Sequence, residues 1–173
     1  MRARKLLPLL MAAVLGVSAL SGCGNSIDAG KTGATLDGQE ISLGFMNFMA
    51  RYQQAIYDGN FASMFGQDQD IWGQNFFEED VDSETSVKKS VADSIEEYYL
   101  LEKHMSDYKV EITDEELSAM DAAAEKFMED NTKSAINQLG ATKDYVKEML
   151  RLTTIQSKMR NAIHAEVDTE VSD

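Results

Sequence analysis

Apolar residues recur at spacings of three and four over most of the sequence, which is the periodicity of helices with one buried face. This pattern predicts long helices over about residues 42–58, 83–108, 113–130 and 142–165, with a shorter one over about 132–139. A mainly α fold is therefore expected. The residues expected on the buried faces are Phe45, Met46, Met49, Tyr52, Ile56, Val87, Val91, Ile95, Tyr98, Met105, Tyr108, Leu117, Met120, Ala124, Phe127, Met128, Tyr145, Met149, Leu152, Ile155, Met159 and Ile163.

Several of these helices have recognisable ends. Ser42 is placed to cap the first helix. Thr113 and Glu116 form a capping box, in which each side chain accepts a hydrogen bond from a backbone N–H that the helix leaves unpaired. Gly140 is expected to end the short helix in the left-handed conformation. The only proline, Pro8, precedes all the predicted helices, so none of them is interrupted by one.

A different pattern precedes the helices. Residues 34–42 alternate in polarity around Asp37-Gly38, a dipeptide that suits a tight hairpin turn because both residues tolerate a positive φ. Two very short strands are expected there, and no larger sheet. Residues 24–33 are rich in Gly, Ser, Asn and Asp and contain little apolar material, so we expect a flexible tether.

Residues 59–82 break the helical periodicity and are rich in glycine, acidic residues and aromatic residues, which favours a long loop with at most one short helical turn. Asp82 or Ser83 is placed to cap the helix that follows. The apolar side chains of this segment either fold back over the core, which we favour, or line an exposed groove. These candidate binding residues are Phe61, Met64, Phe65, Ile71, Trp72, Phe76 and Phe77.

The N-terminal segment indicates export. Basic residues precede an apolar stretch from Leu6 to Leu20, which is shorter than a membrane-spanning helix and typical of a signal peptide. Leu20-Ser21-Gly22-Cys23 resembles the sequence read by lipoprotein signal peptidase, so we expect residues 1–22 to be removed after Gly22 and Cys23 to be lipidated. Residues 23–33 would then be the lipidated cysteine and its tether. The alternative is an ordinary thiol after a conventional signal.

Charge and composition narrow the possible partners. The formal net charge of −14 becomes −17 once the three basic residues of positions 1–22 are removed, and such a surface repels nucleic acid. The single cysteine excludes a disulfide within the chain. Eight methionines follow the predicted signal, and methionine suits either an irregular core, which we favour, or a surface that adapts to many partners.

The order of these motifs resembles the N-terminal chaperone domain of the PrsA and SurA foldases, extracytoplasmic proteins that carry parvulin-type prolyl isomerase domains. The resemblance rests on Leu36-Asp37-Gly38-Gln39-Glu40-Ile41-Ser42, on the helix from Val87 to Tyr108 leading into Val110-Glu111-Ile112-Thr113-Asp114-Glu115-Glu116, and on Leu139-Gly140-Ala141-Thr142. It covers about residues 34–173 and implies a SurA-like helical domain there. The predicted lipid anchor favours the PrsA side of the comparison.

The chain also departs from that family. Residues 59–82 are longer and more acidic than the family's usual first connection, and no isomerase domain lies within residues 1–173. Val171-Ser172-Asp173 resembles the junction before such a domain, so we expect the sequence to continue into one. Peptidyl-prolyl isomerase activity would depend on that part, and we expect no catalytic residues in residues 1–173.

The sequence offers few other residues that could form a catalytic or metal site. His104 and His164 are expected to be surface residues of long helices. No cofactor and no metal site are expected, because zinc ligands are not clustered. One acidic run could supply oxygen ligands to calcium but lacks the ordered spacing of a calcium loop, so we favour a solvated acidic segment. Its members are Asp68, Asp70, Glu78, Glu79, Asp80 and Asp82.

Together these features predict a chaperone or foldase module, anchored by lipid to the cell membrane and facing its extracytoplasmic side. The expected partners are unfolded or newly exported proteins and, through the lipid, the membrane itself; a homodimer is also compatible with the sequence. The alternative is a non-catalytic helical envelope lipoprotein that docks one specific folded partner. A third interpretation, solute capture for a transporter, lacks the alternating strands and helices of two-lobed binding proteins.

Overall fold

A computed structural model describes residues 27–65 and 71–166. The chain is mainly helical with one short antiparallel hairpin, which confirms the predicted fold class. The elements in chain order are β1 (Thr32–Leu36), β2 (Gln39–Ser42), α1 (Leu43–Phe65), α2 (Ser83–Lys103), the 3-10 helix η2 (Met105–Tyr108), α3 (Asp114–Asp130), α4 (Lys133–Leu139) and α5 (Lys143–Glu166).

The hairpin turns where the sequence predicts it. Leu36 pairs with Gln39 across the turn, and Asp37 and Gly38 both have positive φ values, 48° and 86°. Two successive residues with positive φ match the right-handed twist of the strands, so the Asp-Gly pair sets the register locally. Ile41 of β2 is buried and attaches the hairpin to the helical core.

The segment before β1 is bonded to the start of α1. The backbone N–H of Leu43 donates to Lys31 O at 2.7 Å, and that of Gly44 donates to Ala29 O at 3.1 Å. A side chain at Gly44 would approach Ala29 O to 2.9 Å, so glycine allows this close contact. The folded part of the chain therefore begins by about residue 28 and β1 by Thr32, earlier than the boundary predicted at residue 34.

Helix α1 is longer than predicted. Its start is capped by Ser42, whose Oγ accepts a hydrogen bond from Phe45 N at 3.1 Å. The helix continues through Gly59 to Phe65, whereas the sequence pattern placed its end at residue 58. Phe48 is fully buried although it was not assigned to the core, and Ile56, which was assigned to the core, is exposed. That assignment was wrong because the second half of α1 extends beyond its neighbouring helices.

The second predicted helix is divided in two. Helix α2 begins after Asp82, whose side chain accepts a hydrogen bond from Thr85 N, and it ends at Lys103. The chain then tightens into η2 and leaves it at Lys109, which has a left-handed φ of 54°. The continuous helix predicted over 83–108 is thus wrong in its last turn. Tyr99, and not Tyr98, is the more buried tyrosine of α2.

The remaining helices have the predicted limits. Helix α3 begins with the complete Thr113–Glu116 capping box, in which both reciprocal hydrogen bonds are present. Helix α4 ends at Gly140, which has the left-handed φ of 63° expected for a helix-ending glycine. Thr142 then caps α5 by accepting a hydrogen bond from Tyr145 N at 3.1 Å.

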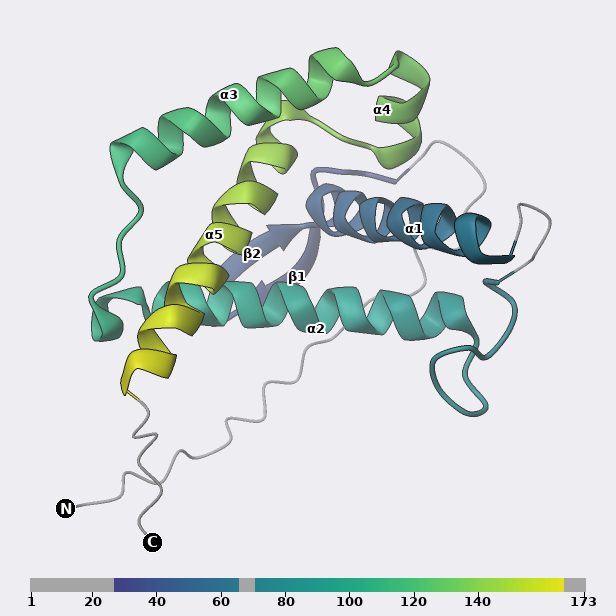
Figure 1. The fold of residues 1–173 in the computed structure, drawn as a ribbon, viewed down its shortest axis with the longest axis horizontal. Coiled ribbons are helices and arrows are strands. Elements are labelled where there is room, and N and C mark those ends of the chain that lie inside the picture. The colour runs from purple at the N-terminus through teal and green to yellow at the C-terminus, as the bar shows by residue number, and fades with distance from the viewer. Residues whose placement is uncertain (1–26, 66–70, 167–173) are drawn as a thin grey trace, which may run out of the picture.

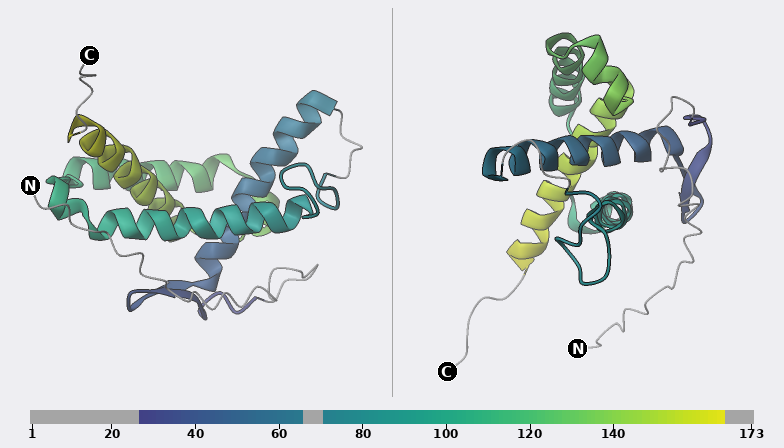
Figure 2. Two further views of the ribbon diagram at one scale, coloured as in Figure 1. Left: turned by 90° about the horizontal axis from the view of Figure 1, so that it is seen from below. Right: turned by 90° about the vertical axis from the view of Figure 1, so that its right-hand side faces the viewer.

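Helix α5 is the common support of the fold. Figure 1 shows α5 crossing the molecule between α3 and α2, and both helices pack against it. Val146, Leu152 and Ile155 of α5 are almost fully buried. Helix α1 runs opposite to α2 in Figure 1, and the view from below in Figure 2 shows that the two helices cross, so that the end of α1 projects away from α5.

Candidate functional site

Five aromatic residues gather at the projecting end of α1. Tyr57 and Phe61 lie on that helix, and Trp72, Phe76 and Phe77 come from the loop that joins it to α2. The ring centroids are 5.2 Å apart for Tyr57–Phe77, 5.5 Å for Phe61–Phe76 and 6.3 Å for Tyr57–Trp72. Tilted and edge contacts at such distances are favourable between aromatic rings. These five residues are referred to below as the aromatic cluster.

A buried serine holds the loop against α2. Ser83 is fully buried, and its Oγ donates to Gln74 O at 2.6 Å and accepts from Phe76 N at 3.2 Å. Its backbone N–H also donates to Gln74 O, at 2.7 Å. On the other side, Trp72 Nε1 donates to Asp58 Oδ1 at 2.8 Å. The described part of the loop is therefore fixed to both helices by hydrogen bonds.

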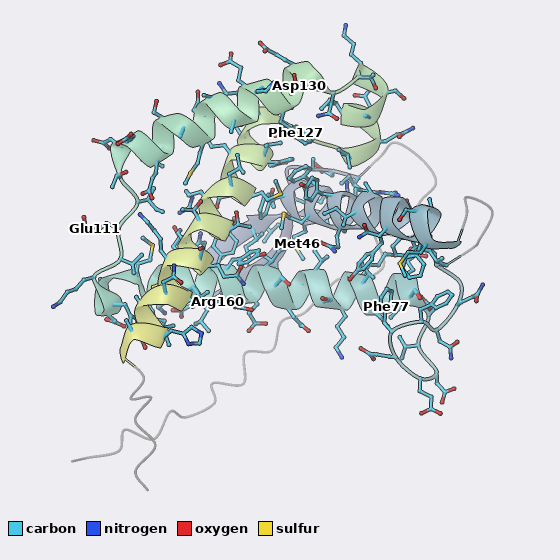
Figure 3. The ribbon with its side chains drawn as sticks, viewed as in Figure 1. Met46, Phe77, Glu111, Phe127, Asp130 and Arg160 are labelled. Atoms are coloured by element: carbon cyan, nitrogen blue, oxygen red, sulfur yellow. The ribbon has the colours of Figure 1, made fainter. Side chains whose placement is uncertain are left out.

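The candidate residues differ in exposure. Ile71 is buried and packs inward. Phe61 and Trp72 are half-buried, whereas Met64, Phe76 and Phe77 are 72%, 49% and 42% exposed. The side chain of Phe65 lies outside the described part of the structure. Figure 3 labels Phe77 on the side of the molecule where α1 ends and α2 begins. The segment thus covers the core with some side chains and presents others to solvent.

The surroundings of the cluster are acidic. The described parts of positions 52–87 contain six Asp or Glu residues and no Lys, Arg or His. Glu78, Glu79 and Asp80 follow directly after Phe77 and are exposed. The carboxylate of Asp82 has a structural task, because hydrogen bonds from the backbone and hydroxyl of Thr85 hold the pKa of Asp82 below its ordinary value.

A shallow polar groove begins beside the same loop. Its volume is about 220 Å³, and it is lined by Glu78 from the loop and by residues of α2. Ser86, Ser90 and Ser94 lie along it at helical spacing, together with Lys89, Asp93 and Glu97. Ser86 is buried, and within the part of the chain that the structure describes its Oγ has no hydrogen-bond partner.

Ion pairs elsewhere tie the helices together. Arg151 of α5 binds Glu148 and also Glu102 of α2, and these hydrogen bonds, Glu148 first, raise the pKa of Arg151 above its ordinary value. Tyr99 donates to Glu148 Oε1 at 3.0 Å. Burial is the main cause that raises the pKa of Tyr99 above its ordinary value. Each of these four residues is bonded to another of the four, so they form a structural link between α2 and α5.

Among the described residues, the histidines and carboxylates do not gather into a metal-binding group. His104 is exposed and lies 2.8 Å from Asp107 Oδ2, and His164 is exposed near the end of α5. Over residues 27–65 and 71–166, no group of three or more His, Cys, Asp or Glu side chains is placed to hold a metal ion. Asp68 and Asp70, part of the alternative calcium site, lie outside the described residues.

The signal and anchor cannot be placed in this structure. Gly22 and Cys23, the predicted cleavage and lipidation residues, lie outside the described residues. Among the helices that are described, none combines the length and apolar character needed to cross a bilayer.

Some members of the site were missed from the sequence. Tyr57 and the supporting Ser83 and Asp58 were not assigned to it, nor were the serines of the groove. The spacing of Tyr57 and Phe61 by four residues would have placed both on one helical face, had the helix been extended past Gly59. No pattern in the sequence predicts the hydrogen bonds of Ser83 with Gln74 and Phe76.

Comparisons with known proteins do not add to this picture. No protein-family model, no curated protein and no solved structure matches the chain. The resemblance to the PrsA and SurA foldases therefore stays a prediction from the motifs, and the aromatic cluster with its surroundings is the feature that bears on function.

Proposed function

We propose that this chain is a membrane-anchored extracytoplasmic chaperone module that binds unfolded, newly exported polypeptides through the aromatic cluster. The observation that carries the proposal is the exposure of Met64, Phe76 and Phe77 at one end of an otherwise well-packed domain. Exposed apolar side chains gathered in one place favour contact with apolar segments of another chain. The hydrogen bonds of Ser83 with the backbone of Gln74 and Phe76 hold this part of the loop in position before a client arrives.

The contacts available at the cluster suit chains without a fixed shape. Phe76 and Phe77 offer flat apolar faces. Met64, which is not part of the cluster but lies three residues after Phe61 on α1, offers a flexible, polarisable side chain that adapts to different partners. No deep apolar cavity is needed for such binding. The negative charge of the domain would keep a complex with an aggregation-prone client in solution.

The arrangement also suits attachment to a membrane. The chain reaches the domain beside the start of α1, where residues 29 and 31 are bonded to Gly44 and Leu43. Tyr57 and Phe61 of the aromatic cluster lie toward the other end of this 23-residue helix, roughly 20–27 Å from Leu43 at 1.5 Å per residue. With a lipid on Cys23, α1 would hold the binding surface away from the point where the tether joins the domain.

Suppression of aggregation tests the proposal. Residues 24–173, with no lipid, are added in increasing molar ratio to a chemically unfolded client, and light scattering follows its aggregation after dilution. We expect suppression by the wild type and its loss in Phe76→Ser/Phe77→Ser. Leu100→Ser is the matched control, because Leu100 of α2 is as exposed as Phe76, at 49%, but lies outside the cluster.

The outcomes separate the two candidate functions. No suppression by the wild type at several-fold molar excess contradicts a chaperone role, and equal activity of the double variant contradicts the assignment to the cluster. Tight binding to one folded envelope protein, with no affinity for denatured chains, would favour the alternative of a docking lipoprotein. Incorporation of labelled palmitate into the full-length chain, and its absence in Cys23→Ser, tests the anchor.

A further inference from the structure

We infer that the polypeptide segments bound at the aromatic cluster are cationic as well as apolar, with an aromatic or aliphatic residue on Phe76 and Phe77 and neighbouring Lys or Arg residues over the acidic loop and the α2 groove. The inference rests on the proposed function and names the class of client segment that this site selects.

The charge around the aromatic cluster is negative. The described parts of positions 52–87 contain six acidic residues and no basic residue. Glu78 and Glu79 follow directly after the exposed ring of Phe77, so an apolar residue placed on that ring brings its chain neighbours close to carboxylates. Complementary charge raises association rates and rejects like-charged segments. The exposed ring faces can also accept a guanidinium or ammonium group.

The groove along α2 continues the acidic surface of the loop. Glu78 belongs to both features, because it follows the aromatic residues and lines the groove of about 220 Å³ along α2. Glu78, Asp93 and Glu97 supply three carboxylates to its lining, against one basic side chain, Lys89. Long Lys and Arg side chains can lie along such a surface and place their charge beside a carboxylate.

Ser86 also lines the groove, and its buried hydroxyl has unused hydrogen-bonding capacity among the described residues. Its Oγ has no hydrogen-bond partner among the described residues, although the side chain is more than nine-tenths buried. Buried polar groups normally have partners, and a hydroxyl can both donate and accept. A backbone carbonyl or amide of an extended segment would match both capacities once the segment displaces the atoms that cover this hydroxyl.

A single metal ion does not fit this surface as well as a peptide does. Within residues 27–65 and 71–166, the acidic side chains are not grouped closely enough to hold such an ion. They are instead distributed over the loop and successive turns of α2. Charges distributed along a line match the separated positive charges of an extended chain.

Three fluorescent peptides test the inference by anisotropy titration against residues 24–173. All contain the same two aromatic residues, and the remaining positions carry Lys, Ser or Glu. At low ionic strength we expect the Lys peptide to bind at least tenfold more tightly than the Glu peptide, with the Ser peptide between them. The preference should shrink in 0.5 M NaCl, because salt screens exposed charges.

A charge-neutralising variant locates the effect. Glu78→Gln/Glu79→Gln/Asp80→Asn should weaken binding of the Lys peptide several-fold and leave the Ser peptide nearly unchanged. Asparagine suits position 80, where φ is 63°. The matched control is Glu40→Gln/Glu115→Gln/Glu129→Gln, which removes the same number of charges from exposed positions outside the loop and α2.

A groove-filling variant tests the second half of the inference. Ser90→Trp places a large side chain in the groove, and Ser118→Trp makes the same change at an exposed position of α3. We expect only the former to weaken binding of the Lys peptide, with circular dichroism confirming that both fold. Unchanged affinity in Ser90→Trp overturns the role of the groove.

The results distinguish this inference from the proposed function. Equal affinity for all three peptides, or equal losses in the loop variant and its matched control, overturns the charge selection and leaves apolar client binding intact. Failure of all three peptides to bind, together with no suppression of aggregation, contradicts the proposed function itself.

Discussion

Aromatic residues near the two ends of α1 differ in how deeply they are buried. Near its start, Phe48 is fully buried, and its ring lies 6.3 Å from that of Tyr145 on α5. Near its end, Phe61 contacts Phe76 at 5.5 Å, but Phe76 itself remains half exposed. The same residue type therefore builds the core at one end of the helix and a surface at the other.

The difference comes from what covers each end. The first turns of α1 meet several elements, because Met46 lies against Gly33 of β1, Asn47 against Gly140 after α4, and Phe45 against Tyr145. The last turns meet mainly the loop that leads to α2. Burial of an aromatic residue thus depends on how many layers surround it, and a helix that extends past its neighbours displays whatever residues its end carries.

The largest expected effect contrasts the two ends directly. Phe48→Ala should lower the free energy of unfolding by about 3–5 kcal/mol, because it removes a large buried side chain and leaves a cavity. Phe77→Ala should lower it by less than about 1 kcal/mol, since half-exposed side chains lose little burial. Urea titration followed by circular dichroism measures both. Similar losses in the two variants would contradict the contrast.

The next effect concerns the support of the aromatic cluster. Ser83→Ala should cost about 0.5–1.5 kcal/mol, because it removes the buried hydroxyl that donates to Gln74 O and accepts from Phe76 N. Hydrogen exchange at the Phe76 amide should accelerate, whereas the amides of α3 should be unaffected. Ser90→Ala, an exposed change on the same helix, serves as the control. Unchanged exchange at Phe76 would show that Ser83 does not hold the loop.

The smallest effect is a dependence on pH that belongs to the α3–α5 framework. Hydrogen bonds from Lys158, and next from Thr113, lower the pKa of Glu116 below its ordinary 4.5. Those from Lys143 and Lys147 lower the pKa of Asp121 below 3.8. A carboxylate with a lowered folded-state pKa stabilises the fold above its ordinary pKa, and this contribution is lost as the pH falls through the folded-state value.

Thermal unfolding measured between pH 7 and pH 2 should therefore show a falling midpoint below about pH 4.5. Glu116→Gln should remove part of that dependence while leaving client binding near neutral pH unchanged, because the aromatic cluster lies on α1 and its loop. A variant with the same acid dependence as the wild type would contradict the role of this ion pair. The Glu116 side chain is 31% exposed, so solvent screening keeps the effect modest.

Much of the fold could be predicted because its signals are local. The Asp37-Gly38 turn, the Thr113–Glu116 capping box and the helix-ending Gly140 each depend on a few adjacent residues, and all three are present as predicted. Boundaries set by long-range contacts could not be predicted in this way. Gly59 lowers helix propensity by roughly 1 kcal/mol relative to Ala, yet α1 continues because Tyr57 and Phe61 pack against the loop.

The candidate site was predicted only in part, because the placement of its side chains also depends on long-range contacts. Composition alone singled out Phe61, Phe76 and Phe77, which do meet, and Trp72, which contacts Tyr57. It could not tell the buried Ile71 from the exposed Phe76. Facing directions within α1 and α2 depend on tertiary packing, so Phe48 and Tyr99 were missed. The lipid anchor, the clients and an isomerase domain stay predictions.

The position of α5 constrains when this domain can fold. It is the last of the described helices along the chain, yet α2 and α3 both pack on it, and its Val146, Leu152 and Ile155 fill the core. A polypeptide that leaves an export channel with its N-terminus first would expose apolar faces on α1 to α4 before this partner emerges. If the chain is exported as proposed, native packing would be delayed until nearly all of the described sequence has crossed, and the emerging chain would stay unfolded during translocation.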